Sequence, residues 1–496
     1  MNMASAEPLN LTWVFVLIIV VLLVSIYKSN DQVEGNGVYV EPSLWYIGSW
    51  RFFLKPYEFI EERLRQLPSE FMFRVMNNTA VVLRGAVGRD AFFSPGMNLT
   101  GGNLLLNPMV GDLKKLKARF GGEKEWSKFV YQLFSPDACS RNLPVLLKEA
   151  KVHLDSLEAS GVIDLERELH LLTTKLFIRT TICHELCDDE ESFTTLIDSG
   201  SVLSAGTDPK SLIFPWFPTP ARISRWLAGS RLYSVIQKIV TARQGEHDRK
   251  SDLIQELLDR GLSPPEITLF VISIYLIGVP TVTSAVTALL VYMQTQPEWM
   301  ERVQADVKAF AATHANTGKG NIPFANTSLS DWDKASPNLD QCISETLRLT
   351  IIGGFLRQTA TDTPVRPGLT LSKGTFALFP SAELHLNPTY YPSPDAWDPT
   401  RWTPEAVKER SHHGLVYLGF GAGRHPCLGK HFAMLVTRVI VVLLFHEFEF
   451  QIVDETTCTQ LVTVPEMTRY IDRPRVPKEK VYFQYERRIV EPVSRA

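Results

Sequence analysis

The sequence has no excess of basic residues, because 51 Lys and Arg residues stand against 54 Asp and Glu residues and leave a net charge of −3. Proteins that bind nucleic acid use basic side chains to neutralise phosphates, so we expect no nucleic-acid partner. Repeats, low-complexity tracts and a clear interdomain linker are also lacking. With 45% hydrophobic and 21% charged residues, the chain has an ordinary globular composition, which argues against disorder, collagen-like structure and coiled coil.

Cysteine is scarce, and six residues scattered over 496 positions do not form a disulfide framework. We therefore expect most of the chain to face a reducing compartment. Cys183 and Cys187 flank His184 at a spacing of one helical turn, which is either half of a zinc site or a pair of buried thiols on a helix face. No second ligand pair follows at a matching spacing, and this favours buried thiols.

A first long uncharged segment, Leu11 to Tyr27, holds 17 residues, near the lower limit for spanning a hydrocarbon core of about 30 Å. The first ten residues carry only Glu7, which argues against a cleaved signal peptide. Positive charges follow the segment more often than they precede it, and this places the C-terminal part in the cytosol. We expect a membrane anchor at 1–28, a Pro/Gly-containing connector at 29–56 and a catalytic domain at 57–496.

A second uncharged stretch runs from Ile267 to Pro297 and is long enough to be another membrane span. It opens with Ser263 and Glu266 at the spacing of a capping box, as in an ordinary soluble helix. Its centre is polar, with a proline and several hydroxyl side chains that would be costly against lipid. We therefore expect a long buried helix.

The remaining pattern indicates a single large core, although at about 150 residues per domain the length alone would suggest about three domains. Short strands are expected at Phe71–Val75 and Ala80–Leu83, and the pattern from 110 to 312 is mostly helical. Residues 357–402 are rich in proline with little helical period, and Lys430–Phe445 returns to helix. The expected fold class is mainly α, that is, a helix-rich α+β protein with small β-sheets.

The most informative segment is the ten-residue loop from Phe420 to Gly429, which directly precedes an apolar helix. Gly421 and Gly423 allow a tight turn, and Cys427 is expected near backbone N–H groups and a helix N-terminus, which favour the thiolate that binds iron. The alternative is a glycine-rich turn with a buried thiol.

This loop resembles the cysteine motif of the cytochrome P450 family, the haem-thiolate monooxygenases, which reads F-G-x-G-x-R/H-x-C-x-G. Every position matches, with His425 in the Arg/His slot. The resemblance implies that Cys427 is the axial thiolate of the iron in haem b. It also implies that Phe420 lies against the proximal side of this ligand and that Gly423 and His425 belong to the cofactor site.

Two charged motifs of the same family precede the cysteine loop in the expected order. Glu345 and Arg348 resemble the family's E-x-x-R, and their i,i+3 spacing on a helix lets them pair. The segment 394–402 resembles P-x-x-F-x-P-x-R-F, and by this resemblance Arg401 completes a charged triad with Glu345 and Arg348.

Two cationic residues resemble propionate ligands of the haem. Arg357 corresponds to the strand arginine that pairs with a propionate, a bond that suits a planar guanidinium. Trp126 lies where many members carry W-x-x-x-R, but Val130 occupies the arginine position. Lys124 or Lys128 is then the substitute, and a solvated lysine is the alternative reading.

The long helix departs from the family pattern [A/G]-G-x-[D/E]-T-T, whose acid relays protons and whose threonine takes part in oxygen activation. Gly278 and Thr281 align with this pattern, but Pro280 replaces the acid. Proline removes a helical hydrogen bond, so we expect a kink at this position. Proton delivery then has to use Thr281, Thr283, water or the substrate.

The resemblance implies a monooxygenase in the endoplasmic reticulum membrane that acts on a lipophilic small molecule. The enzyme would receive electrons from NADPH indirectly, through an NADPH-dependent reductase, with cytochrome b5 as a second candidate electron donor. The passage 214–220 resembles the sterol-demethylase side of the family and favours a terpenoid or steroid-like substrate, unless it is only a membrane-contacting loop. The overall pattern resembles specialised metabolism in filamentous fungi. The competing hypotheses are a haem-thiolate isomerase or dehydratase without O2 or reductase, and a haem-binding sensor or electron carrier.

Overall fold

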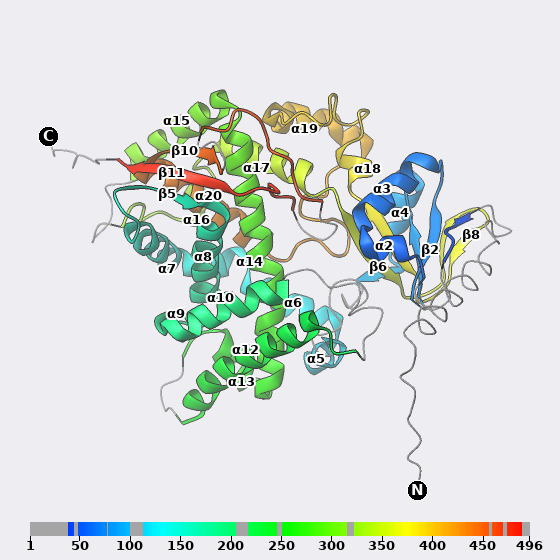
Figure 1. Ribbon diagram of the computed structural model, residues 1–496, viewed down its shortest axis with the longest axis horizontal. Helices are drawn as coiled ribbons and strands as arrows, with labels where there is room; N and C mark the ends of the chain where they lie inside the picture. The colour runs from blue at the N-terminus through cyan, green and yellow to red at the C-terminus, as the bar shows by residue number, and fades with distance from the viewer. Residues whose placement is uncertain are drawn as a thin grey trace, which may run out of the picture. The chain divides into compact units, whose positions relative to one another are not determined.

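The computed structural model describes residues 38–43, 48–76, 78–99, 113–204, 217–245, 250–314, 322–455, 459–469 and 474–488. They fall into two compact units (Figure 1). The first contains the described residues up to 99 together with Gly353–Glu383, and the second contains the remainder. The expected anchor at 1–28 lies outside the described residues, as do parts of the connector and residues 214–216. The boundaries expected for the anchor, connector and catalytic domain stay a prediction.

The first unit is built around a six-stranded sheet in the order β1-β2-β3-β9-β6-β4, with β7 and β8 forming a separate pair. Its strands are β1 (Tyr39–Val40), β2 (Phe71–Val75), β3 (Asn78–Val82), β4 (Met97–Leu99), β6 (Gly354–Thr359), β7 (Thr363–Arg366), β8 (Leu369–Leu371) and β9 (Phe376–Pro380). Its helices are α2 (Trp50–Leu54), α3 (Pro56–Gln66) and α4 (Gly85–Phe92). The chain passes to the second unit within α18 (Ala382–His385).

The apolar alternation of β2 explains how this sheet is held. Phe71 and Phe73 point to the same buried side of the strand, and both rings pack against Phe59 of α3. The expected strand Phe71–Val75 is confirmed. Its partner begins at Asn78 rather than Ala80, because Asn78 pairs with Val75 and extends the antiparallel ladder toward the turn.

The second unit is mostly helical and includes one three-stranded sheet in the order β10-β11-β5. Its first helices are α5 (Leu113–Arg119), α6 (Glu123–Leu133), α7 (Pro136–Asp155), α8 (Leu165–Phe177), η1 (Ile178–Ile182), α9 (Glu185–Asp188), α10 (Glu190–Ser204), α12 (Pro220–Gly245) and α13 (Leu253–Asp259). Its later helices are α14 (Pro264–Gln294), α15 (Pro297–His314), α16 (Leu329–Trp332), α17 (Pro337–Thr350), η2 (Pro399–Trp402), α19 (Pro404–Arg410), η3 (Ser411–His413) and α20 (Lys430–Glu447). The strands are β5 (Ser160–Asp164), β10 (Phe448–Asp454) and β11 (Val481–Arg487).

Helix α14 is the core helix of the second unit and packs against α8, α12, α17 and α20 (Figure 1). It begins with the expected capping box between Ser263 and Glu266 and continues without interruption through Pro280. Among the described residues it is also the one helix apolar and long enough to cross a membrane, but more than half of its most apolar stretch is buried inside the protein. The prediction of a long buried helix is confirmed.

The two helices expected near the candidate site are present with slightly longer bounds. The helix expected at residues 340–349 is α17, which starts at Pro337 with the Ser336 hydroxyl as its N-cap. The helix expected at Lys430–Phe445 is α20, which extends to Glu447 and is buried along most of its length. The helix-rich fold class with small sheets is therefore confirmed for the described residues.

Candidate functional site

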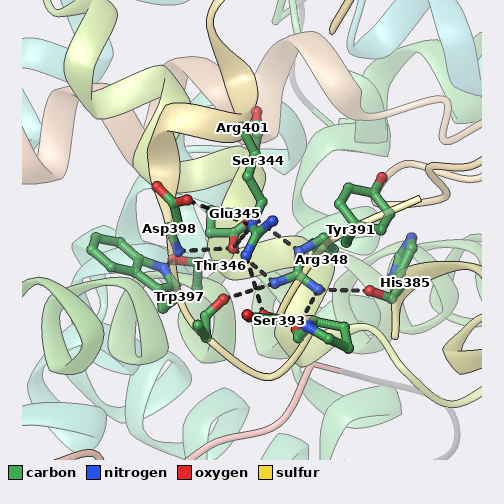
Figure 2. Close-up of polar contacts among 12 residues, drawn as sticks. Ser344, Glu345, Thr346, Arg348, His385, Tyr391, Ser393, Trp397, Asp398 and Arg401 are labelled. Carbon is green, nitrogen blue, oxygen red and sulfur yellow. Dashed lines mark hydrogen bonds and ion pairs between the residues drawn. The ribbon is translucent and has the colours of Figure 1, made fainter. Parts of the chain in front are cut away.

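A buried ion pair at the end of α17 forms the centre of a polar cluster (Figure 2). Glu345 and Arg348 are both completely buried, and the Arg348 Nε and Nη2 atoms donate to the two carboxylate oxygens of Glu345 at 2.9 and 2.8 Å. This bidentate geometry is the strongest that a guanidinium and a carboxylate can adopt. The expected side-by-side placement on one helix face is therefore observed.

Glu345 has two further hydrogen-bond donors and a second cationic neighbour, which together stabilise a carboxylate that water cannot reach. The backbone N–H of Asp398 and the indole N–H of Trp402 each donate to it at 2.9 Å. The Nε of Arg401 lies 3.3 Å from it as a second ion pair, so all three members of the expected charged triad meet. Because a buried charge is tolerated only when it is paired and hydrogen-bonded, this set of donors explains why Glu345 can be fully buried.

Arg348 ties α17 to the chain that leads toward the cysteine loop. Its Nη1 donates to the backbone carbonyls of His385 at 2.6 Å and Pro394 at 2.7 Å, and its Nη2 donates to that of Ala396 at 3.0 Å. Its guanidinium also lies 4.8 Å from the ring centre of Tyr391, close enough for a cation–π contact (Figure 2). One arginine therefore fixes the path of the segment 385–396.

His385 connects this cluster to the cysteine loop. Its Nδ1 lies 2.9 Å from the carbonyl of Ile351, and its Nε2 lies 2.8 Å from the backbone N–H of Leu418, two residues before Phe420. Since an N–H can only donate, Nε2 is the acceptor and Nδ1 carries the proton. Burial, assisted by the charge of Arg348, lowers the pKa of His385 to about 3, so the ring is neutral.

Sequence reasoning missed three residues of this network. His385 carries no motif that marks it as a link, and its role depends on tertiary contacts. Trp397 and Trp402 occupy positions where the family motif has phenylalanine, and both use the N–H that phenylalanine lacks. Trp397 donates to the hydroxyl of Thr346 at 3.0 Å, and Trp402 donates to Glu345. The replacement of both motif phenylalanines by tryptophan was the signal in the sequence that these side chains donate hydrogen bonds.

The cysteine loop turns twice before α20 begins. Gly421 and Gly423 have φ angles of +65° and +68°, a region in which a side chain would be strained. The N–H of Cys427 donates to the carbonyl of Phe420 at 2.7 Å, which closes the loop. His425 is half-buried and Cys427 is exposed, whereas Cys139, Cys183 and Cys342 are buried. Among the described thiols, Cys427 is thus the one that a bound group can reach most freely.

The electrostatic setting of Cys427 differs from the expectation. Although the residue keeps exposed surface, the protein packed around its sulfur removes enough water to raise the pKa of the thiol above the ordinary value, and the N–H of Gly429 and the charge of Lys430 oppose this only in part. The loop by itself therefore does not favour the thiolate, and a metal ion is needed to displace the proton.

The other cysteine hypothesis concerned Cys183 and Cys187. Cys183 is buried and Cys187 is half-buried, and burial raises the pKa of both thiols, that of Cys187 to about 12. Cys183 lies in extended backbone before α9, whereas Cys187 lies within α9, so the expected placement of both thiols on one helix face is wrong, although the burial of Cys183 agrees with a structural thiol.

The three residues expected at the oxygen-binding turn lie on α14 but face different surroundings. The Thr281 hydroxyl donates to the carbonyls of Ile277 at 2.7 Å and Gly278 at 3.0 Å. Gly278 packs so closely on Phe177 that an added Cβ would come within 2.9 Å of the ring. Pro280 lines a groove on a further face of the helix. Close packing against Phe177 therefore explains why position 278 is a glycine, independently of any role in oxygen binding.

Several residues fit a large, apolar, anionic ligand such as haem. The Ile277 side chain is 71% exposed although α14 is otherwise largely buried, so the described residues leave an apolar surface beside Thr281. Arg357 is buried in the first unit against the ring of Phe92, has no carboxylate partner among the described residues, and has a pKa lowered to about 10 by burial. A buried cation of this kind is suited to an acidic substituent.

Lys128 and Trp126 fit the haem less well. Trp126 is buried, and its ring packs 4.8 Å from that of Phe270 on α14. Lys128 is exposed on α6, so the described structure does not distinguish a propionate ligand from a solvated lysine. Its suggested role stays a prediction.

Residues 127–468 match the family model of cytochrome P450, so the chain belongs to the cytochrome P450 family. The chain is similar to cytochrome P450 monooxygenase AacuE of Aspergillus aculeatus, with 26% identity over 82% of this chain and 85% of the relative. It is also similar to cytochrome P450 monooxygenase dmxR5 of a Cryptosporiopsis species, with 25% identity over 78% and 77%. A third relative is the sterol 14-demethylase of Arabidopsis thaliana, with 24% identity over 90% and 92%.

The fold agrees with this family. The structure of a retinoic acid-bound cyanobacterial CYP120A1 covers 90% of this chain and 98% of its own, with a TM-score of 0.70 and 20% sequence identity. The chain is an oxidoreductase of the monooxygenase type, and family membership implies a haem with thiolate ligation. The identity of the substrate and the roles of the site residues are proposals.

Proposed function

We propose that the protein is a haem-thiolate monooxygenase that inserts one oxygen atom of O2 into a lipophilic small molecule. The observation that carries this proposal is the loop in which Gly421 and Gly423 turn the chain and leave Cys427 exposed ahead of α20. A haem bound to this cysteine would supply oxygen activation. The electrons come from NADPH through a reductase, with cytochrome b5 as a second candidate donor.

The residues of this chain take separate parts in the reaction. Cys427 binds the iron, and Gly423 and Phe420 shape the loop around it, with the Phe420 ring 5.6 Å from the Lys430 amine. Arg357 binds a propionate, Lys128 is the weaker candidate for the same task, and His425 belongs to the cofactor site. Glu345, Arg348 and Arg401 hold the segment that leads to the loop. Thr281 offers its hydroxyl on the apolar face of α14, next to Ile277, where substrate and oxygen meet.

The substrate proposed is a terpenoid, a steroid-like compound or another specialised metabolite. Two observations support this class. Named relatives are monooxygenases of Aspergillus and Cryptosporiopsis, and a further relative is named a sterol 14-demethylase. The exposed apolar side chain of Ile277 also suits a hydrophobic ligand. We propose that residues 1–28 anchor the protein to the endoplasmic reticulum membrane with the catalytic part in the cytosol, where the reductase delivers its electrons.

A second candidate function is an isomerase or dehydratase that rearranges an activated substrate without O2 or reductase. Pro280 favours it, because this turn of α14 lacks the acid that normally relays protons. Thr281 argues against it, because its hydroxyl is retained and already fixed toward the carbonyls of Ile277 and Gly278.

The test begins with a panel of terpenoids, sterols and polyketides titrated into the purified holoenzyme while its haem spectrum is followed. Panel members that shift the spectrum are then incubated with the enzyme, with and without NADPH and reductase. A monooxygenase forms a product that is heavier by one oxygen atom, and only when NADPH, reductase and O2 are present. Product formation without any of the three would support the isomerase function instead.

A further inference from the structure

A groove of about 980 Å³ lies within the second unit, along the side of α14 that carries Pro280. Its walls come mainly from α8 and α10, which both pack against α14, and from residues 477–481 at the start of β11 (Figure 1). Cys427 and Thr281 do not line it. Its volume is in the range of pockets that hold a small organic molecule. The groove is therefore a candidate ligand site apart from the proposed haem site.

The floor of the groove carries buried hydroxyl groups that have no hydrogen-bond partner in the described part of the chain. Thr283 is 2% exposed and Thr287 is completely buried, and both belong to this group. The Nε2 of His170, on the α8 wall, likewise lacks a partner among the described residues. A buried polar group without a partner is unfavourable. The floor therefore favours an occupant that forms hydrogen bonds to it.

Other hydroxyls of the same helix are satisfied by the helix itself. Thr268 and Ser273 donate to the carbonyls four residues earlier, at 2.8 and 2.6 Å. Thr283 and Thr287 make no such bond, although the same kind of carbonyl is within reach of a helical threonine. Their oxygens and hydrogens are therefore both available to an occupant of the groove.

The charges of the lining favour a cation. Six carboxylates line the groove against three permanent cations, namely Asp164, Glu166, Asp188, Glu190, Asp198 and Glu479 against Arg167, Lys175 and Lys480. Helix α10, which forms one wall, contains no lysine or arginine. The groove thus keeps an excess of negative charge.

Two of the three cations already have neighbours of their own. Lys480 pairs with Asp164 at 3.2 Å, and the Lys175 amine lies 5.7 Å from the centre of the Phe193 ring. In contrast, three exposed carboxylates of the lining have no ion pair among the described residues, namely Glu190, Asp198 and Glu479. These three carboxylates are the part of the lining that a bound cation would neutralise.

The groove also has an apolar part. Leu171, Phe193, Ile197 and Val481 contribute to the lining together with the polar groups. An occupant that matches all of these features carries several positive charges, several hydrogen-bond donors and short hydrocarbon segments between them. A linear aliphatic polyamine has this chemistry.

We infer that the groove binds an organic polyamine, which pairs with Glu190, Asp198 and Glu479 and donates hydrogen bonds to the hydroxyls of Thr283 and Thr287. The methylene segments of the ligand pack on the apolar side chains of the lining. The binding is non-covalent, and the inference is independent of the proposed monooxygenase function.

The probe is spermidine, and triethylene glycol serves as an uncharged chain of similar length. Binding of each to the purified holoenzyme is measured by isothermal titration calorimetry at low salt. We expect one spermidine to bind per chain and triethylene glycol not to bind. Sodium chloride should weaken the binding of spermidine, because salt screens exposed charges. The haem spectrum should stay unchanged, since the ligand does not reach the haem site.

The first pair of variants tests the charge. Glu190→Gln removes a carboxylate of the groove. Its control is Glu191→Gln, because Glu191 is the next residue of α10, is also exposed and does not line the groove. We expect spermidine to bind about threefold more weakly to Glu190→Gln, as for the loss of an exposed ion pair, and equally well to Glu191→Gln and wild type.

The second pair tests the buried hydroxyls. Thr287→Val removes a hydroxyl of the floor and keeps the size of the side chain. Its control is Thr268→Val on the same helix, where the hydroxyl is bonded to the carbonyl of Pro264 and does not line the groove. Loss of a hydrogen bond to an ammonium group should weaken the binding of spermidine about tenfold in Thr287→Val, with no change in Thr268→Val. If Thr287→Val fails to bind haem, Thr287→Ala takes its place.

Three results would overturn the inference. If spermidine does not bind to wild type, the groove holds water alone. If the two variants of either pair bind spermidine equally well, the probe binds elsewhere or by general attraction to the protein surface. If spermidine shifts the haem spectrum, or if triethylene glycol binds as tightly as spermidine, the site or the charge requirement is wrong. The monooxygenase function is tested separately, by product formation with NADPH and reductase, and stands or fails independently.

Discussion

Glu345 shows what one buried carboxylate requires in order to be tolerated. It accepts hydrogen bonds from Arg348, Trp402 and the backbone of Asp398, and it pairs with Arg401. Removing one partner of such a set leaves the others without compensation, which is usually more damaging than replacing the whole set by apolar residues.

We therefore expect Glu345→Ala and Arg348→Ala each to lower the free energy of unfolding by about 3–5 kcal/mol and to yield little haem-loaded protein. The measurement is the haem content per polypeptide after purification. The control is Arg302→Ala, which breaks an exposed pair with Glu298 on α15 and should leave haem content unchanged. Normal haem content in both cluster variants would show that the pair does not support the site.

Trp402 and Trp397 offer a finer comparison, because phenylalanine stands at both positions in the family motif. Trp402→Phe removes a donor to a buried charge and should cost about 1.5–3 kcal/mol, whereas Trp397→Phe removes a donor to a neutral hydroxyl and should cost about 0.5–1.5 kcal/mol. Urea unfolding of the two variants shows which one loses more free energy of unfolding. The reverse order would mean that ring packing, rather than hydrogen bonding to Glu345, decides the preference for tryptophan.

At the scale of elements, His385 connects the end of α17 to the cysteine loop through hydrogen bonds at both ring nitrogens. This arrangement requires the neutral ring. Below about pH 6.5 the unfolded chain binds a proton at this residue, whereas the folded chain does not until about pH 3. The unfolded state then holds more protons, so His385 makes stability rise with pH in this window and fall as the pH is lowered.

For wild type this contribution approaches a slope of about 1.4 kcal/mol per pH unit between the two pKa values. His385→Asn keeps one donor and one acceptor but cannot titrate, so its unfolding free energy should fall less between pH 6.5 and pH 4. Urea unfolding at several pH values gives both curves. Parallel curves for the two proteins would contradict the neutral, buried histidine.

Helix α14 carries the departure from the family pattern, and Thr281 is its most testable residue. If its hydroxyl directs protons to oxygen, Thr281→Ala should retain haem and the spectral shift on ligand binding, and should divert most NADPH electrons to hydrogen peroxide. Peroxide and product are measured against NADPH consumed. Unchanged product and peroxide yields would remove this role and favour protonation by the substrate or the isomerase function.

Local signals predicted individual elements well where the chemistry is local. Ser263 and Glu266 predicted the start of α14, and the glycines of the cysteine loop predicted its turns, because both effects depend on a few adjacent residues. The link through His385, the use of the Trp402 N–H and the contact of Gly278 with Phe177 could not be predicted, because each depends on a residue distant in sequence. Pro280 does not end α14, which continues through it, and the expected kink stays a prediction.

At the scale of the whole molecule, the buried cluster and the cysteine loop belong to the second unit, where Arg348 connects α17 to residues 385–396 and His385 contacts the backbone of Leu418 just before the loop. Arg357 belongs to the first unit. We propose that haem binding contributes to the stability of the protein, because a ligand that binds only the folded state favours that state.

The most direct test of the proposal that Cys427 ligates haem iron is the spectrum of the reduced protein with carbon monoxide. Wild type, Cys427→Ala and the control Cys187→Ala are compared, since Cys187 is half-buried and has no part in the proposed site. We expect the long-wavelength Soret band of thiolate-ligated haem in wild type and in Cys187→Ala, and its loss in Cys427→Ala. A retained band in Cys427→Ala would contradict the assignment of Cys427 as the iron ligand.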